Sequence, residues 1–75
     1  MSEAELEKFF SYAHLPEKLQ KVSKPFGETA RLLFDTLPDN RERAKALDRL
    51  LEAKDAAVRS VIFGAPSRSG DSEVR

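Results

Sequence analysis

Apolar residues recur at intervals of three and four along two long segments of this 75-residue chain. Such spacing is typical of amphipathic helices, because 3.6 residues per turn bring these positions onto one face. The pattern predicts a helix of about 21 residues from Pro16 to Leu37 and a second helix from about Arg41 to Phe63. The apolar stripes consist of Leu19, Val22, Phe26, Ala30, Leu33 and Leu37 in the first helix and Ala44, Leu47, Leu51, Val58 and Ile62 in the second.

Prolines and short polar residues mark the ends of these predicted helices. Pro16 fits a first helical position, because its fixed φ suits a helix and its missing N–H needs no partner there. Pro38 ends the first long helix, and Asp39 or Asn40 is expected to cap the second. Gly64 is expected just past the end of the second long helix. Together these signals predict a short polar turn between two antiparallel helices.

Pro25 lies inside the first long helix and predicts a kink there. It donates no N–H, and its ring crowds the carbonyl of Lys21. Gly27 follows two residues later and is expected to loosen the backbone further. The kink is therefore expected at Lys24-Pro25.

A third, shorter helix is predicted at the start of the chain, over residues 2–10. Ser2 and Glu5 have the spacing of a capping box, in which each side chain bonds the other residue's backbone N–H. The last stretch, residues 65–75, is rich in serine, glycine and charge and is expected to be disordered. The sequence thus predicts one all-α domain over residues 1–64 with a C-terminal tail.

A two-helix hairpin offers each helix only one stripe and leaves apolar residues on its outer flanks. Lys54 interrupts the stripe of the second long helix, and we interpret it as an aliphatic stem over apolar surface with its ammonium in water. Because a second copy of the chain could cover the remaining apolar residues, we expect a homo-oligomer. The uncovered residues are Phe9, Phe10, Phe34, Val61 and Phe63.

Composition narrows the possible functions. Lysine and arginine together number 13, as do aspartate and glutamate, so the formal net charge is zero and binding to DNA or RNA polymers is not expected. The chain has no cysteine and one histidine, which leaves oligomerisation rather than disulfides or a metal as its stabiliser. It has neither an apolar run of membrane-spanning length nor a signal-peptide pattern, so we expect no membrane partner and a cytoplasmic location.

The residue inventory favours a binding protein over an enzyme. His14 is the only histidine, and the sequence has no glycine-rich phosphate loop, paired metal ligands or nucleophile elbow. No catalytic residue, cofactor or metal is therefore predicted. A phosphodiesterase that uses His14 or the carboxylates remains a third hypothesis.

Tyr12 and Lys24 form the best candidate ligand pair. Tyrosine offers a flat face on which a nucleobase can stack, and lysine supplies a mobile point charge suited to phosphate. Lys24 also directly precedes the predicted kink, where a ligand or another subunit could approach. The structural alternative is that Tyr12 packs at the end of the hairpin with its hydroxyl in water.

The order of several short motifs resembles the phage anti-CBASS sponge family and is similar to the related anti-Thoeris sponges. The resemblance covers roughly residues 10–62, and its strongest part is the turn before the second long helix. The motifs are Phe-Ser-Tyr-(x)3-Pro-(x)3-Gln-x-Val-Ser-Lys-x-Phe, Leu-Pro-Asp-Asn-x-Glu-Arg-(x)2-Ala-Leu-(x)2-Leu and Glu-Ala-(x)2-Ala-Ala-Val-Arg.

The resemblance implies a kinked helical hairpin that assembles into a homohexamer. It implies binding of cyclic dinucleotides, and often trinucleotides, without cleavage, in the host bacterial cytoplasm if the chain is phage-encoded. By position, Tyr12 matches the tyrosine that stacks on a base, and Lys24 matches the lysine that contacts phosphate. Arg59 matches a region that serves the trinucleotide pocket, and Ala13 and His14 would lie near that second pocket.

The chain departs from the family pattern at three positions. Asp55 replaces an asparagine, and its carboxylate would repel a nearby phosphate. Pro25 and Gly27 stand where a helix former and an alanine are usual. A hypothesis of another class therefore stays open, in which a helical oligomeric interaction protein docks through Phe9, Phe10 and Phe34 and binds no nucleotide.

Overall fold

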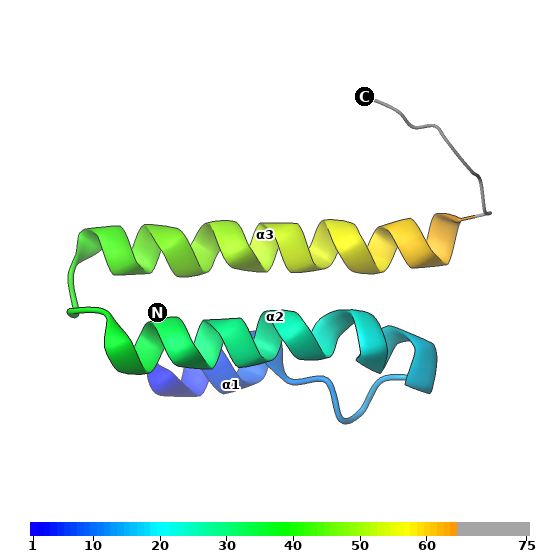
Figure 1. Cartoon of the computed structure of the whole chain (residues 1–75), viewed down its shortest axis with the longest axis horizontal. Coiled ribbons are helices and arrows are strands. Elements are labelled where there is room, and N and C mark those ends of the chain that lie inside the picture. Colours follow the sequence, from blue (N-terminus) through cyan, green and yellow to red (C-terminus); the bar gives the residue numbers. More distant parts are fainter. Residues whose placement is uncertain (65–75) are drawn as a thin grey trace.

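Two long helices run side by side in opposite directions, and a short N-terminal helix packs against the first of them (Figure 1). The computed structural model describes residues 1–64, so the predicted disorder of residues 65–75 lies outside the described residues. The helices are α1 (Glu3–Phe10), α2 (Glu17–Thr36) and α3 (Arg41–Phe63), and no strand occurs within residues 1–64. The all-α prediction is confirmed for this part of the chain.

The caps of α1 and α3 follow the sequence signals. Glu5 N–H donates to Ser2 Oγ at 3.2 Å, and Ser2 N–H donates to Glu5 Oε1 at 2.8 Å, which completes the predicted capping box. The hydrogen bond from the Ser2 backbone also lowers the pKa of Glu5. Asn40, one of the two predicted caps, accepts from Arg43 N–H at 2.9 Å at the start of α3.

The ends of α2 differ slightly from the prediction. Pro16 is not the first helical residue, because its ψ of 153° is extended and the helix begins at Glu17. At the other end, Leu37 is extended with a ψ of 148°, as expected for a residue that precedes proline. The helix continues through Pro25, and the kink proposed there stays a prediction.

The core is small and lies where α1 covers the hairpin. Its fully packed apolar residues are Leu6 and Phe10 from α1, Ala30 from α2 and Leu47 from α3. The prediction that Phe10 is left uncovered is therefore wrong, because α1 folds back over α2 and buries its ring.

Phe34 is also partly covered, because the Arg43 guanidinium carbon lies 4.3 Å from its ring centroid. Arg31 and Asp35, four residues apart on α2, form an ion pair at 3.2 Å. Asp55 and Arg59 have the same spacing on α3, but no ion pair joins them within the described residues.

The far end of the hairpin is open. Ile62 belongs to the predicted apolar stripe of α3, yet it is 60% exposed, and Phe63 is 76% exposed. Figure 1 shows α1 beside the half of α2 that is next to the α2–α3 turn, away from the C-terminal end of α3. No helix within residues 1–64 is both long and apolar enough to cross a lipid bilayer.

Candidate functional site

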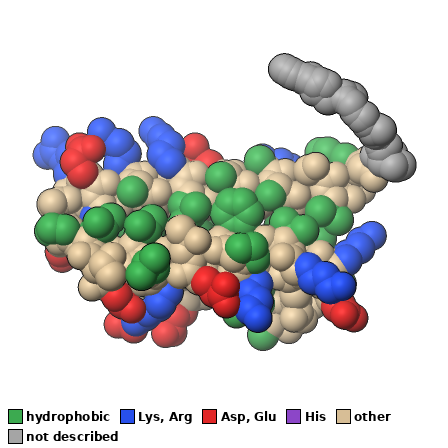
Figure 2. Space-filling model, viewed as in Figure 1, with side chains coloured by type: hydrophobic (Ala, Val, Ile, Leu, Met, Phe, Trp, Pro, Cys, Tyr) green, Lys and Arg blue, Asp and Glu red, His purple; other side chains and the backbone are tan. Residues whose placement is uncertain are grey.

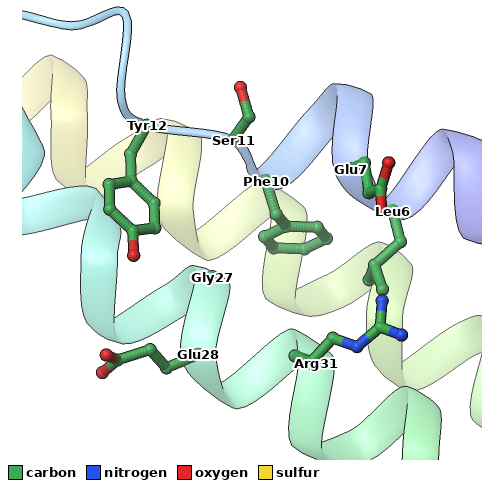
Figure 3. A pocket seen from close by; sticks show the side chains of 8 residues that line it. All are labelled: Leu6, Glu7, Phe10, Ser11, Tyr12, Gly27, Glu28 and Arg31. Atoms are coloured by element: carbon green, nitrogen blue, oxygen red, sulfur yellow. The ribbon is translucent and has the colours of Figure 1, made fainter.

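A cleft with a volume of about 340 Å³ lies between the C-terminal half of α1, the residues that follow it and the middle of α2 (Figure 3). Leu6, Phe10 and Tyr12 supply its apolar and aromatic lining, and charged side chains from both helices stand around it. The remaining lining residues are Glu7, Ser11, Gly27, Glu28 and Arg31.

Tyr12 reaches the cleft because the chain after α1 passes very close to α2 at Gly27. A Cβ atom at this position would lie 2.9 Å from the Phe10 carbonyl oxygen and 3.2 Å from the Tyr12 ring carbon Cε2. A backbone oxygen cannot move aside as easily as a flexible side-chain end, so only glycine fits. Gly27 therefore permits close packing, rather than loosening the backbone as predicted from the sequence. An isolated glycine in a helical pattern was the available signal.

Lys24 lies one helical turn before Gly27 and does not itself line the cleft. Positions three, four and seven residues apart share a face of a helix, so Lys24 lies on the face that also presents Glu28 and Arg31 to the cleft. Its side chain is exposed and forms no hydrogen bond or ion pair within residues 1–64. Tyr12, in the connection between α1 and α2, packs its ring against Gly27, and Lys24 lies one turn before Gly27 on α2.

The other two predicted site residues lie apart from the cleft lining. His14 is exposed in the connection between α1 and α2, where its Nδ1 is 3.3 Å from Ser11 Oγ. Arg59 is exposed on α3, at helical spacing from the exposed Asp48, Glu52 and Asp55. A single copy of the chain does not join Arg59 to Tyr12.

Some of the charged side chains around the cleft form hydrogen bonds or ion pairs, and others form none. Arg31 donates to Glu3 at 2.8 Å and to Asp35 at 3.2 Å, and the hydrogen bond to Glu3, with that to Asp35, raises the pKa of its guanidinium. Glu7 and Glu28 form no hydrogen bond or ion pair among residues 1–64. The uncommitted charges that line the cleft are therefore carboxylates, and the nearby uncommitted cation is Lys24.

Two residues that the sequence analysis did not assign to the site hold the segment of Tyr12 in place. Lys54 reaches from α3 to α1, where its Nζ donates to the Phe9 carbonyl and lies 5.9 Å from the Phe10 ring centroid. The sequence suggested that this ammonium lies in water, whereas in the structure it donates a hydrogen bond to the backbone of α1. A lysine that interrupts an apolar stripe was the only signal for this contact.

Gln20 is the second of these residues. Its Nε2 donates to the carbonyls of Leu15 at 2.7 Å and Ala13 at 3.2 Å. These bonds tie the α1–α2 connection to the first turn of α2, since backbone carbonyls in a connection need partners. Gln20 belongs to the first motif quoted above, but its spacing did not indicate which groups it would bind.

Within the described residues, no group of three histidine, cysteine, aspartate or glutamate side chains is arranged to hold a metal ion. The chain matched no protein-family model, no curated protein and no solved structure. Any functional assignment therefore rests on the motifs of the chain and on the geometry of the cleft.

Proposed function

We propose that this protein binds and sequesters cyclic dinucleotide and trinucleotide immune signals without cleaving them, and so antagonises CBASS-like antiphage defence. The observation that carries the proposal is the Tyr12 ring in the lining of the cleft, packed against Gly27, with the exposed Lys24 one turn before Gly27 on α2. The motif resemblance independently gives these two residues the roles of base stacking and phosphate contact.

The chemistry of the pair suits such a ligand. Stacking of a base on an aromatic side chain contributes about 1–3 kcal/mol, and a lysine adds a mobile charge for phosphate. A cyclic dinucleotide carries two bases and two phosphates, whereas one chain supplies one such tyrosine and one such lysine. Two copies related by a two-fold axis would supply both pairs. Local positive charge can then arise although each chain has no net charge.

Exposed apolar side chains support assembly as part of the proposal. Figure 2 shows hydrophobic side chains in a row along the line where α2 and α3 meet. Leu32 is 59% exposed on α2, and Ile62 is 60% exposed on α3. Burying such residues between copies would add the apolar contact area that one chain lacks. The resemblance implies a homohexamer as the assembled form.

Calorimetric titration with a panel of cyclic dinucleotides, cyclic trinucleotides and cyclic ADP-ribose variants tests the proposal. Binding is expected for at least one cyclic dinucleotide, with loss of at least tenfold in affinity for Tyr12→Ala and Lys24→Ala. Lys45→Ala is the matched control, because Lys45 is also an exposed lysine but lies on α3, away from the face of α2 that carries Lys24 and Glu28. Absence of heat with every ligand at micromolar protein would contradict the proposal.

Recovery of the ligand separates sequestration from hydrolysis. After heat denaturation of the complex, the cyclic nucleotide is expected to return intact. A linear product would instead support the phosphodiesterase hypothesis, in which His14 or carboxylates act on the phosphodiester bond.

The second candidate function is docking of a protein partner without a nucleotide ligand. The exposed Phe9, Ile62 and Phe63 favour it, whereas Phe10 is buried and so cannot belong to a docking surface. On this alternative, Ile62→Asp abolishes activity while Tyr12→Ala and Lys24→Ala leave it intact. Phe34→Asp would be a poor test, because Phe34 packs against the core.

A further inference from the structure

The carboxylate of Glu28 is an uncommitted polar group at the Tyr12 end of the cleft. Figure 3 shows Tyr12 and Glu28 at one end and Glu7 with Arg31 at the other. Glu28 forms no hydrogen bond or ion pair within residues 1–64, although Lys24 precedes it by one turn of α2. A base that stacks on Tyr12 would therefore present an edge toward an open carboxylate.

An ionised carboxylate only accepts hydrogen bonds, and it has two oxygens with which to do so. Guanine carries two adjacent donors on its Watson–Crick edge, N1–H and the N2 amino group, which match a carboxylate side by side. Adenine has only one donor on this edge, its amino group, beside the lone pair of N1. If adenine faced the carboxylate in the same way, the N1 lone pair would be repelled by the negative charge of Glu28. Hydrogen bonds to ionised groups are about twice as strong as neutral ones, which makes this difference a means of base selection.

We propose that the cleft prefers cyclic dinucleotides that contain guanine, with the base stacked on Tyr12 and its Watson–Crick edge bound by Glu28. This inference rests on the proposed function, since it names the ligand that the same site selects. The phosphate lies toward Lys24, because a phosphate beside Glu28 would be repelled. Lys24 and Glu28 are four residues apart, which is about 6 Å along the axis of α2. The phosphate and the edge of the base therefore contact different turns of the helix.

The other charged residues of the cleft do not fit this role. Arg31 is engaged by Glu3 and Asp35 at 2.8 and 3.2 Å. Glu7 lies at the opposite end of the cleft from Tyr12 (Figure 3). Glu28 is therefore the acceptor that a base on Tyr12 can reach.

The test compares cyclic di-GMP with cyclic di-AMP by calorimetry, because these ligands share one backbone and differ only in their bases. The wild-type protein is expected to bind cyclic di-GMP at least about tenfold more tightly, as a good bidentate contact discriminates by that much or more. In Glu28→Gln, affinity for cyclic di-GMP is expected to fall about tenfold. Glu28→Gln should bind cyclic di-AMP at least as tightly as the wild type does, because a glutamine amide can pair with adenine.

Asp48→Asn is the control, since it removes one negative charge on α3, outside the cleft lining. This variant is expected to keep the guanine preference. Equal binding of the two ligands by the wild type, or a preference that survives in Glu28→Gln or is lost in Asp48→Asn, would overturn the inference and leave the proposed function intact. Failure of the wild type to bind any cyclic dinucleotide would overturn the proposed function, and the inference with it.

Discussion

The two ends of the α2–α3 hairpin differ in what covers them. At the covered end, next to the α2–α3 turn, α1 packs over the hairpin, and Ala30 and Leu47 are fully buried. At the open end, Ile62 and Phe63 are 60% and 76% exposed. Apolar side chains of this hairpin are fully buried only where a third helix covers them. Since Tyr12 follows α1 directly, the helix that seals the core also places the candidate ligand residue.

The largest expected difference in stability is between two truncations of an aliphatic side chain, one at each end of the hairpin. Leu47→Ala at the covered end should lower the free energy of unfolding by about 2–5 kcal/mol, as for other buried leucines. Ile62→Ala at the open end should change the stability of the single chain by less than about 0.5 kcal/mol. Urea unfolding followed by circular dichroism measures both.

Protein concentration sharpens this contrast. Association makes stability depend on concentration, so Ile62→Ala should destabilise only at concentrations where the chain assembles, whereas Leu47→Ala should destabilise at all of them. Equal losses for the two variants at low concentration would show that the ends do not differ as described.

Gly27→Ala tests how tightly the segment after α1 packs on α2 at the covered end. The added methyl group would stand 2.9 Å from the Phe10 carbonyl oxygen, and overpacking of this kind costs about 1–3 kcal/mol. Alanine returns about 1 kcal/mol of helix propensity, so we expect a net loss of stability and a displaced Tyr12. Thermal unfolding is the measurement, with Thr29→Ala as the exposed control on α2. Net stabilisation by Gly27→Ala would rule out the close approach.

Lys54→Met tests the contact that joins α3 to the end of α1. Methionine keeps most of the aliphatic stem but cannot donate to the Phe9 carbonyl, so we expect a loss of about 0.5–1.5 kcal/mol of stability. Binding of the preferred cyclic dinucleotide should weaken as well, because the segment of Tyr12 is less firmly held. Lys45→Met, on the exposed side of the same helix, should affect neither denaturant unfolding nor calorimetric affinity. Unchanged binding in Lys54→Met would remove Lys54 from the support of the site.

Ser23→Ala is expected to have the smallest effect. The Ser23 side chain is fully buried, and its hydroxyl oxygen has no hydrogen-bond partner. Removing an unpaired buried hydroxyl relieves a desolvation cost, so we expect a stability change between zero and about 1 kcal/mol in the favourable direction. A differential scanning calorimetry melt measures it. Clear destabilisation would indicate that the hydroxyl has a hydrogen-bond partner.

The sequence predicted the helices well because periodicity and capping are local. The capping box of Ser2 and Glu5, the cap at Asn40 and the span of α3 are all confirmed. The prediction from the sequence failed where the burial of a residue depends on how α1 folds back over α2, because no local pattern encodes that contact. Phe10 therefore proved to be core rather than flank, and Ile62 proved to be exposed.

The candidate site also has features that the sequence predicted and features that it did not. Residue chemistry selected Tyr12, whose ring packs against Gly27 of α2, and Lys24, which lies one turn before Gly27. The role of Gly27 in close packing and the bond from Lys54 to Phe9 depend on contacts between distant segments. Arg59 lies on the exposed face of α3, so its predicted part in a pocket depends on a second copy.

Native mass spectrometry of the protein with and without a cyclic dinucleotide tests the central claim most directly, because one spectrum reports both copy number and ligand mass. The account predicts a homo-oligomer, a hexamer on the family resemblance, that carries cyclic dinucleotide of unchanged mass. A single chain with no ligand, or an assembly that releases ligand heavier by one water, would contradict it.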